Sequence, residues 1–464
     1  MDFTVYAIAF AILVSILTMR FVLREQNAVQ QISGPPSPSW PFGHMLQLML
    51  PSQYGDYEFQ WLKQFGSVYR VKGCFGQDRL VVADPLALQY ILGSSAFGRA
   101  GMLYVILNLL YRERSVIDAQ GDEHRRIRAA LNAGFTATAV REYEPVFQKV
   151  AESISKKLET CARTNIYPLL ISATLDATSQ AILGHCIRDL GEDFIANNTQ
   201  IVELTATQST TQILLDALSV RFPLWLWRAM MYLPTTALKA MREGRYLTDQ
   251  LGRRIVGEKL DAASKGLEMN DDLFSRLVDP DTPDKLSGDD LVAQIGFILI
   301  AGQETTANAI SFGLLELAKH PDLQDSLRAE ITSAVDASAG AVVYDNMPLL
   351  NAFIKETIRL YPAMPLVERV ALQDTTIPLA GPITSSTGDM RYIHVAKGQH
   401  VTLGIAAYQR LESRWGVDAH KFNPSRWIDE TMSRRESVGP YANLLSFLGG
   451  SRTCLGWRFA ILEM

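Results

Sequence analysis

Cysteine is scarce in this chain, which has four cysteines among 464 residues. They are Cys74, Cys161, Cys186 and Cys454, and no two of them form a C-x-x-C pair. This spacing excludes the paired thiolates of a usual zinc site and the disulfide density of a small secreted scaffold. It fits a compartment that keeps thiols reduced.

The sequence also lacks net positive charge, internal repeats and long low-complexity tracts. Its formal net charge is -5, so we expect no nucleic-acid partner, which would need a basic face. No G-x-G-x-x-G fingerprint for a flavin or a nicotinamide follows a predicted strand. What is present, 48% hydrophobic and 20% charged residues, predicts a chain that buries a large core.

An uncharged stretch covers residues 3–19, which is about the minimum length for a helix that spans a bilayer. A cleaved signal peptide and a buried core helix are the alternatives, but no basic segment precedes the stretch and no small-x-small cleavage site follows it. We therefore expect a membrane anchor over residues 1–24. Arg20 and Arg24 follow the span, which places the main body in the cytoplasm by the positive-inside tendency.

Residues 25–43 are rich in glycine and proline, and the fixed φ angles of proline predict a stiff hinge there. Residues 44–464 form the expected globule. Two strands at 67–72 and 79–85 have the pattern of a hairpin, and apolar spacing is helical from 142 to 319. Because strand signals return only near the C-terminal third, the predicted fold is mainly α with a minor β part.

One predicted helix is unusually long. It opens with Ser287 and Asp290 at capping-box spacing and closes before Pro321, so it has about 30 residues and a length of about 45 Å. Its apolar middle is interrupted by a small and polar segment, AGQETT, at residues 301–306. Close helix packing at Gly302 with a solvated Glu304 is one explanation, and a functional site is the other.

A second predicted helix ends before Pro362 and places Glu356 and Arg359 on one face. Such a pair is usually a minor surface ion pair. Near the C-terminus, Ser446 to Phe459 read SFLGGSRTCLGWRF. A buried thiol would explain its cysteine but not the residues around it.

This last stretch fits the pattern F-x-x-G-x-R-x-C-x-G through Phe447, Gly450, Arg452, Cys454 and Gly456. By this motif the chain resembles the cytochrome P450 family, the haem-thiolate monooxygenases. Further matches are AGQETT, the E-x-x-R pair with Arg426 in FNPSRW as its third partner, and His124 with Arg128 one helical turn apart. A solvated basic helix face is the alternative for the last pair. The order of these motifs covers almost the whole chain.

The resemblance implies the cytochrome P450 fold with an N-terminal transmembrane helix, and haem b (iron protoporphyrin IX) as cofactor. Cys454 would be the metal ligand, whose thiolate favours O–O cleavage. Phe447 would shield the sulfur, and Gly450 and Gly456 would let the backbone approach the porphyrin.

The other roles that the resemblance implies concern the rim and the distal side of the cofactor. Arg452, His124, Arg128 and Arg369 would pair with the haem propionates. Ala301 and Gly302 would make room over the iron, and Glu304 and Thr305 would be the catalytic pair that relays protons to dioxygen.

The implied activity is insertion of one oxygen atom from O₂ into a lipophilic small molecule. Electrons would come from an NADPH-cytochrome P450 reductase, with cytochrome b5 as a further candidate donor, at the endoplasmic reticulum membrane. The pocket would draw on residues 97–116 and 205–222. Two alternatives stay open. One is a haem-thiolate enzyme that rearranges peroxides. The other is an inactive remnant, because members of the family usually continue well beyond the position of Met464, so we expect the C-terminal end of the haem domain to be missing here.

Overall fold

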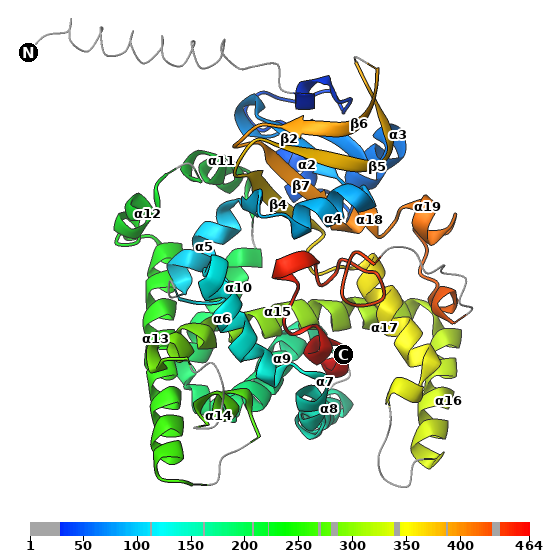
Figure 1. Cartoon of the computed structure of the whole chain (residues 1–464). Coiled ribbons are helices and arrows are strands. Elements are labelled where there is room, and N and C mark those ends of the chain that lie inside the picture. The colour runs from blue at the N-terminus through cyan, green and yellow to red at the C-terminus, as the bar shows by residue number, and fades with distance from the viewer. Residues whose placement is uncertain are drawn as a thin grey trace, which may run out of the picture.

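Figure 1 shows the computed structural model of the chain, in which a helical body lies beside a smaller part rich in strands. The structure describes residues 28–111, 114–160, 163–206, 208–220, 222–267, 271–279, 286–337, 344–386, 388–428 and 437–464. The predicted class, mainly α with a minor β part, is confirmed.

The α-helices follow one another through most of the described chain. Their bounds are α2 Met45–Met49, α3 Glu58–Phe65, α4 Pro85–Gly93, α5 Met102–Leu110, α6 Gly121–Leu131, α7 Ala137–Glu142, α8 Glu144–Glu159, α9 Ile166–Leu183, α10 Glu192–Ala206, α11 Thr210–Ser219, α12 Leu224–Met230, α13 Thr236–Ser264, α14 Leu273–Val278, α15 Gly288–Lys319, α16 Pro321–Ala337, α17 Pro348–Leu360, α18 Ile405–Tyr408, α19 Glu412–Trp415 and α20 Trp457–Glu463. Short 3-10 turns link them: η1 Ala28–Gln31, η2 Cys74–Gly76, η3 Asn132–Gly134, η4 Ile187–Leu190, η5 Tyr344–Asn346, η6 Pro424–Trp427 and η7 Gly450–Arg452.

The strands form one larger sheet and one separate hairpin. Their bounds are β1 Val68–Lys72, β2 Asp78–Val82, β3 Phe97–Arg99, β4 Leu366–Ala371, β5 Thr375–Ser385, β6 Gly388–Val395 and β7 His400–Gly404. The larger sheet has the order β1-β2-β7-β4-β3, in which β2 and β7 run parallel and the other neighbours antiparallel. The predicted β1–β2 hairpin is confirmed, with Val68 opposite Val82.

The long helix α15 begins and ends where the sequence predicts. The Ser287 hydroxyl accepts from the Asp290 backbone N–H at 3.2 Å, and the Asp290 carboxylate accepts from the Ser287 N–H at 3.3 Å. This capping box satisfies two donors that the first turn cannot pair internally. The helix then crosses the helical body in contact with α9 and α13 (Figure 1).

The first described residues pack against the strands and pair with the β5–β6 hairpin. The described part of the expected hinge places Val29 and Ile32 in the same apolar cluster as the strands, and Ile32 bridges to Ser385. These residues therefore belong to the core beside the strands. The expected anchor, residues 1–24, lies outside the described residues, and within the described ranges we find no helix with the length and apolarity that crossing a bilayer requires.

Candidate functional site

The loop that contains Cys454, called the cysteine loop, folds back on itself before α20. The Cys454 backbone N–H donates to the Phe447 carbonyl at 2.8 Å, which closes the segment that contains η7. Gly450 has a φ of +67°, and a Cβ at this position would lie 2.1 Å from the Leu92 carbonyl oxygen of α4. Because both the backbone angle and the contact require glycine, Gly450 fixes the loop against α4.

Cys454 is exposed as a residue, while protein atoms crowd around its sulfur. Burial raises the pKa of this thiol, while the backbone N–H of Gly456 and the charge of Arg128 act in the opposite direction. A cation and an N–H group near the sulfur are the partners that favour a thiolate. A Cβ at Gly456 would meet Phe135 at 3.6 Å, which is an ordinary contact distance. Packing against the described residues therefore does not require this glycine.

Helix α6 divides its basic residues between two faces. His124 is buried and Arg128 half-buried, whereas Arg125 and Arg126 are exposed. The exposed pair bonds to Asp122 and Asp290 respectively. The solvated basic face therefore exists, but His124 and Arg128 are not on it.

His124 and Arg128 belong to a cluster of basic side chains. Burial, together with the charges of Arg452, Arg128 and Arg99, lowers the pKa of His124 to about 4. Burial likewise lowers the pKa of Arg369 to about 10, again with a contribution from Arg99. Since these causes all disfavour positive charge, an anionic group among these residues would relieve them.

Two arginines of this cluster are oriented by backbone carbonyls. Arg452 donates to the carbonyls of Val116 and Ala119 at 3.2 and 2.7 Å. Arg369, on β4, donates to the Glu368 carbonyl at 2.9 Å. The guanidinium groups are thus placed before any ligand arrives.

These residues fit the expected haem. A haem needs one axial ligand from the protein and partners for two propionates. The structure supplies the thiol of Cys454 close to Arg128, with a set of mutually repelling basic groups beside it. By contrast, the described residues contain no group of three or more histidine, cysteine, aspartate or glutamate side chains able to hold a bare metal ion.

Arg99 is a cluster member that sequence analysis missed. It lies on β3 directly opposite Arg369 on β4, so strand pairing delivers both arginines to the same place. Its sequence neighbours carry no motif. Only the register of two strands far apart in the chain identifies it.

The polar segment of α15 lies across from α9. Thr305 is exposed, and its hydroxyl donates to the Ala301 carbonyl at 2.8 Å. Glu304 is half-buried, and burial raises the pKa of its carboxyl. Burial raises the pKa of Tyr167 on α9, and the charge of Glu304 adds to this.

Gly302 serves close helix packing. A Cβ at this position would lie 2.5 Å from the Thr178 hydroxyl oxygen and 2.9 Å from its methyl carbon. The close approach of α9 therefore accounts for the glycine, in line with the explanation that Gly302 serves helix packing. The same explanation expects a solvated Glu304, and this part holds only in part because the Glu304 side chain is half-buried.

The E-x-x-R pair is buried and forms the predicted triad. Arg426 donates from Nε to Glu356 Oε1 at 3.0 Å, and Trp427 donates from Nε1 to Glu356 Oε2 at 2.9 Å. Arg359 also donates to the carbonyls of Gln409 and Ala419, each at 2.7 Å. The network joins α17 to the loop before the cysteine.

Gln409 is a second residue that the sequence did not reveal. Its side-chain amide donates to the carbonyls of Ile358 and Arg359 at 3.1 and 2.7 Å. Its oxygen accepts from the Leu445 N–H at 2.8 Å and from the Ser446 hydroxyl at 3.1 Å. Gln409 thus fixes the start of the cysteine loop to the end of α17.

Phe447 is half-buried and packs in one apolar cluster with Ala309 of α15. Its ring meets that of Tyr441 edge-on, with centroids 6.4 Å apart. This cluster places the cysteine loop beside the same helix that carries Glu304 and Thr305.

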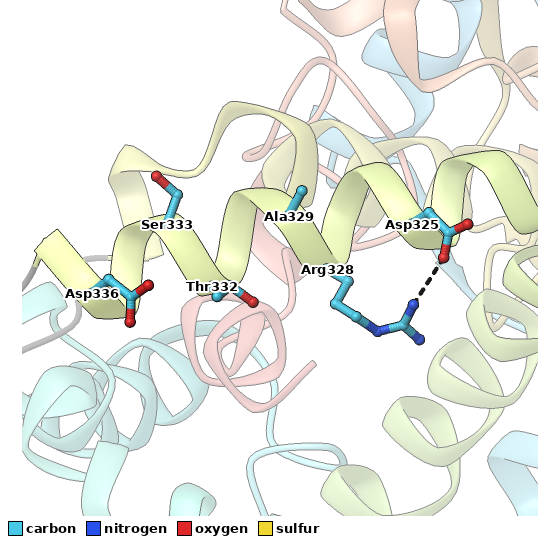
Figure 2. Close-up of a pocket in the computed structure, with 6 residues that line it drawn as sticks. All are labelled: Asp325, Arg328, Ala329, Thr332, Ser333 and Asp336. Carbon is cyan, nitrogen blue, oxygen red and sulfur yellow. Dashed lines mark hydrogen bonds and ion pairs between the residues drawn. The ribbon is translucent and has the colours of Figure 1, made fainter.

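A separate hollow on α16 has no such chemistry. Figure 2 shows its lining residues along one helix: Asp325, Arg328, Ala329, Thr332, Ser333 and Asp336. Its one drawn interaction is the ion pair between Arg328 and Asp325 at 2.8 Å, and both side chains are exposed. We assign it no catalytic role.

Comparison with known proteins identifies the family of this chain. The family described as Cytochrome P450 matches residues 33–464. Cytochrome P450 monooxygenase 91 of Postia placenta is 29% identical, over 94% of this chain and 86% of that protein. Cytochrome P450 monooxygenase claU of Ampulloclitocybe clavipes is also 29% identical, over 95% of this chain and 85% of that protein.

Among solved structures, the retinoic acid bound cyanobacterial CYP120A1 has a similar fold. The TM-score is 0.67 at 22% sequence identity, and the match covers 93% of this chain and 90% of that chain.

Proposed function

Since the match over residues 33–464 shows that this chain belongs to the cytochrome P450 family, we propose that it is a membrane-bound monooxygenase acting on a lipophilic small molecule. The family's cofactor is a haem with an axial thiolate, which supplies activation of O₂ when it is bound. One observation carries the proposal: the thiol of Cys454 lies close to Arg128 in a cluster of buried and half-buried basic side chains.

Within that site, Cys454 would ligate the iron. His124, Arg128, Arg369 and Arg452 would hold the propionates, and Arg99 joins them in this proposal because it lies among the same side chains. The bonds from Arg452 to Val116 and Ala119 keep its guanidinium in place for this task. Such charge-assisted bonds are among the stronger ones in proteins.

Glu304 and Thr305 would be the proton-handling pair. The Thr305 hydroxyl donates a hydrogen bond to the Ala301 carbonyl, so its oxygen can still accept one. Burial raises the pKa of Glu304 toward the range in which a carboxyl both takes up and releases a proton. This supports Glu304 as the proton source and Thr305 as the group that positions the proton.

A monooxygenase of this family requires a redox partner. We propose an NADPH-dependent flavoprotein reductase, with cytochrome b5 as a second donor, because the sequence carries no flavin or nicotinamide fingerprint of its own. The exposed Arg125 of α6 and Arg458 of α20 lie on elements next to the cysteine loop and support a docking face for an acidic partner.

The proposed location is the endoplasmic reticulum membrane, with the body in the cytoplasm. Its support is the uncharged stretch of residues 3–19 and an exposed apolar surface on the α11–α12 segment. Trp225 is 69% exposed and Tyr232 is 81% exposed. Leu218 and Phe222, which are near them in sequence, are exposed as well. Aromatic side chains of this kind favour the lipid interface.

The direct experiment is oxygen labelling. The haem-loaded protein, a flavoprotein reductase and NADPH are incubated under ¹⁸O₂ with a library of steroids, terpenoids, fatty acids and aromatic compounds. We expect a product that carries one ¹⁸O atom and forms only with NADPH. Products that form from added fatty-acid hydroperoxides without O₂ and NADPH would instead establish a peroxide-rearranging enzyme, and failure to bind haem would establish a remnant.

A further inference from the structure

A buried glutamine of α15, Gln294, holds the segment that precedes α6. Gln294 has no accessible surface. Its Oε1 accepts from the Val116 N–H at 2.7 Å. Its Nε2 donates to the Arg114 carbonyl at 2.9 Å and to the Asp290 carbonyl of its own helix at 2.8 Å. Because both ends of the amide are used, this side chain joins α15 to the backbone of residues 114–116.

Asp290 adds a second connection one turn earlier on α15. Its buried carboxylate accepts from Arg114 Nη1 at 3.3 Å and from Arg126 Nη2 of α6 at 3.1 Å. Both arginines are exposed, and ion pairs with exposed partners contribute little. Gln294 is therefore the stronger polar attachment of this segment to α15.

The same segment holds Arg452 from its other side. Arg452 donates from Nη1 to the Val116 carbonyl at 3.2 Å and from Nη2 to the Ala119 carbonyl at 2.7 Å. Val116 thus bonds to Gln294 through its N–H and to Arg452 through its C=O. The Ala119 N–H donates to the Ser115 carbonyl at 2.9 Å, which closes a turn between the two acceptors. A shift of Val116 would therefore disturb both bonds of the guanidinium.

The orientation of Arg452 matters because its guanidinium belongs to the basic cluster. Burial is the main cause that lowers the pKa of His124, and the charge of Arg452 adds to it, so the two groups are close. An arginine that is ordered only when its ligand arrives loses rotamer entropy at that moment. Bonds that already hold the guanidinium remove this cost from ligand binding.

We propose that Gln294 is a positioning residue for the haem, which acts through Val116 to keep Arg452 in the orientation that binds a propionate. Its effect passes through the backbone of residues 114–119, so Gln294 has no catalytic part. The identity of the bound anion rests on the proposed function. The coupling between Gln294 and Arg452, by contrast, is a property of the chain alone.

A double-mutant cycle on haem loss tests this coupling. Rates of haem transfer to apomyoglobin are measured for the wild type, Gln294→Leu, Arg452→Met and the double variant. Gln294→Leu should speed haem loss about 3- to 10-fold, as the loss of about one net hydrogen bond implies. In the Arg452→Met background the same substitution should no longer change the rate. Equal factors in both backgrounds, or an unchanged rate in Gln294→Leu, would overturn the proposal.

Asn197→Leu is the matched control, because it also removes a buried amide. Asn197 of α10 donates to the Ala240 carbonyl of α13 at 3.0 Å, so its bond joins two other helices. Whatever its effect on haem loss, the factor should be the same with and without Arg452. A factor that depended on Arg452 here as well would show that the cycle reports general destabilisation, and the assignment to Gln294 would be overturned.

Hydrogen exchange provides a measurement that does not require Gln294→Leu to fold. Since coupling acts in both directions, Arg452→Met should speed amide exchange in the peptide that contains residues 114–119. Helix α10 serves as the internal reference in the same haem-loaded protein and should exchange as in the wild type. Unchanged exchange in residues 114–119 would overturn the proposal.

The proposed function can fail separately. If the chain bound no haem while Arg452→Met still sped exchange in residues 114–119, the link between Gln294 and Arg452 would stand and the haem assignment would fall. Normal haem binding without any coupling would give the reverse result.

Discussion

Arg359 donates two hydrogen bonds to Glu356, from Nε to Oε2 and from Nη2 to Oε1, and each is 2.8 Å long. Neither side chain has any accessible surface. The pair lies on α17 and, through Arg426 and Gln409, it organises the chain that leads to the cysteine loop.

Removal of one partner should therefore be severe. Glu356→Ala leaves the buried Arg359 without its carboxylate and removes one of the two carboxylates that pair with Arg426, and such a change costs about 3–5 kcal/mol. We expect loss of soluble, haem-loaded protein, measured by yield and thermal unfolding. The matched control is Asp325→Ala, which breaks the exposed pair with Arg328 and should change the free energy of unfolding by less than about 1 kcal/mol. Equal effects of the two variants would refute the assigned burial.

Gly302 and Thr178 should be coupled. Gly302→Ala places a methyl group 2.5 Å from the Thr178 hydroxyl oxygen and should destabilise the fold by about 1–3 kcal/mol, although alanine favours a helix. Thr178→Ala removes the two closest atoms, so the double variant should recover most of the loss. A double-mutant cycle by chemical denaturation measures this, and purely additive effects would contradict the packing account.

The two faces of α6 should differ in haem binding. Arg128→Gln removes a cation beside Cys454 and should speed haem loss, since a propionate partner is gone. Arg125→Gln changes an exposed residue on the same helix and should leave the rate unaltered. Transfer of haem to apomyoglobin gives both rates. Matching rates would assign Arg128 to a structural role.

A buried carboxyl gives a pH dependence of stability. Glu58 accepts from the Ala407 N–H at 3.2 Å, and burial raises its pKa from 4.5 to about 7, while the charge of Arg410 lowers it. The folded state thus holds a proton between about pH 4.5 and 7 that the unfolded state releases, so this group's contribution to stability falls as pH rises through that range.

Glu58→Gln should remove that slope. Relative to the wild type, the variant should gain stability from pH 5 to pH 8, by at most about 3 kcal/mol from the size of the shift. Unfolding midpoints at several pH values test this, with the exposed Glu152→Gln as control. A constant difference between wild type and Glu58→Gln across this range would show that Glu58 does not titrate there.

Local signals in the sequence predicted much of this molecule. Ser287 and Asp290 set the start of α15 within one turn, and the residues around Cys454 form one short motif. Glu356 and Arg359 were also visible because helical spacing joins them. Only the resemblance, through Arg426 as the third partner of this pair, indicated that the two side chains are more than a surface ion pair.

Other features depend on contacts between distant segments. Arg99 enters the cluster through its register with Arg369, and Gly302 is explained by Thr178 on another helix. No periodicity or motif in the sequence encodes such pairings.

The most direct test of the central claim is the spectrum of reduced, carbon-monoxide-bound protein with and without Cys454. The wild type should show a Soret band at about 450 nm, which an axial thiolate produces. Cys454→Ser should lose that band while circular dichroism shows the fold retained. An unchanged band in the variant would contradict ligation of the haem iron by Cys454.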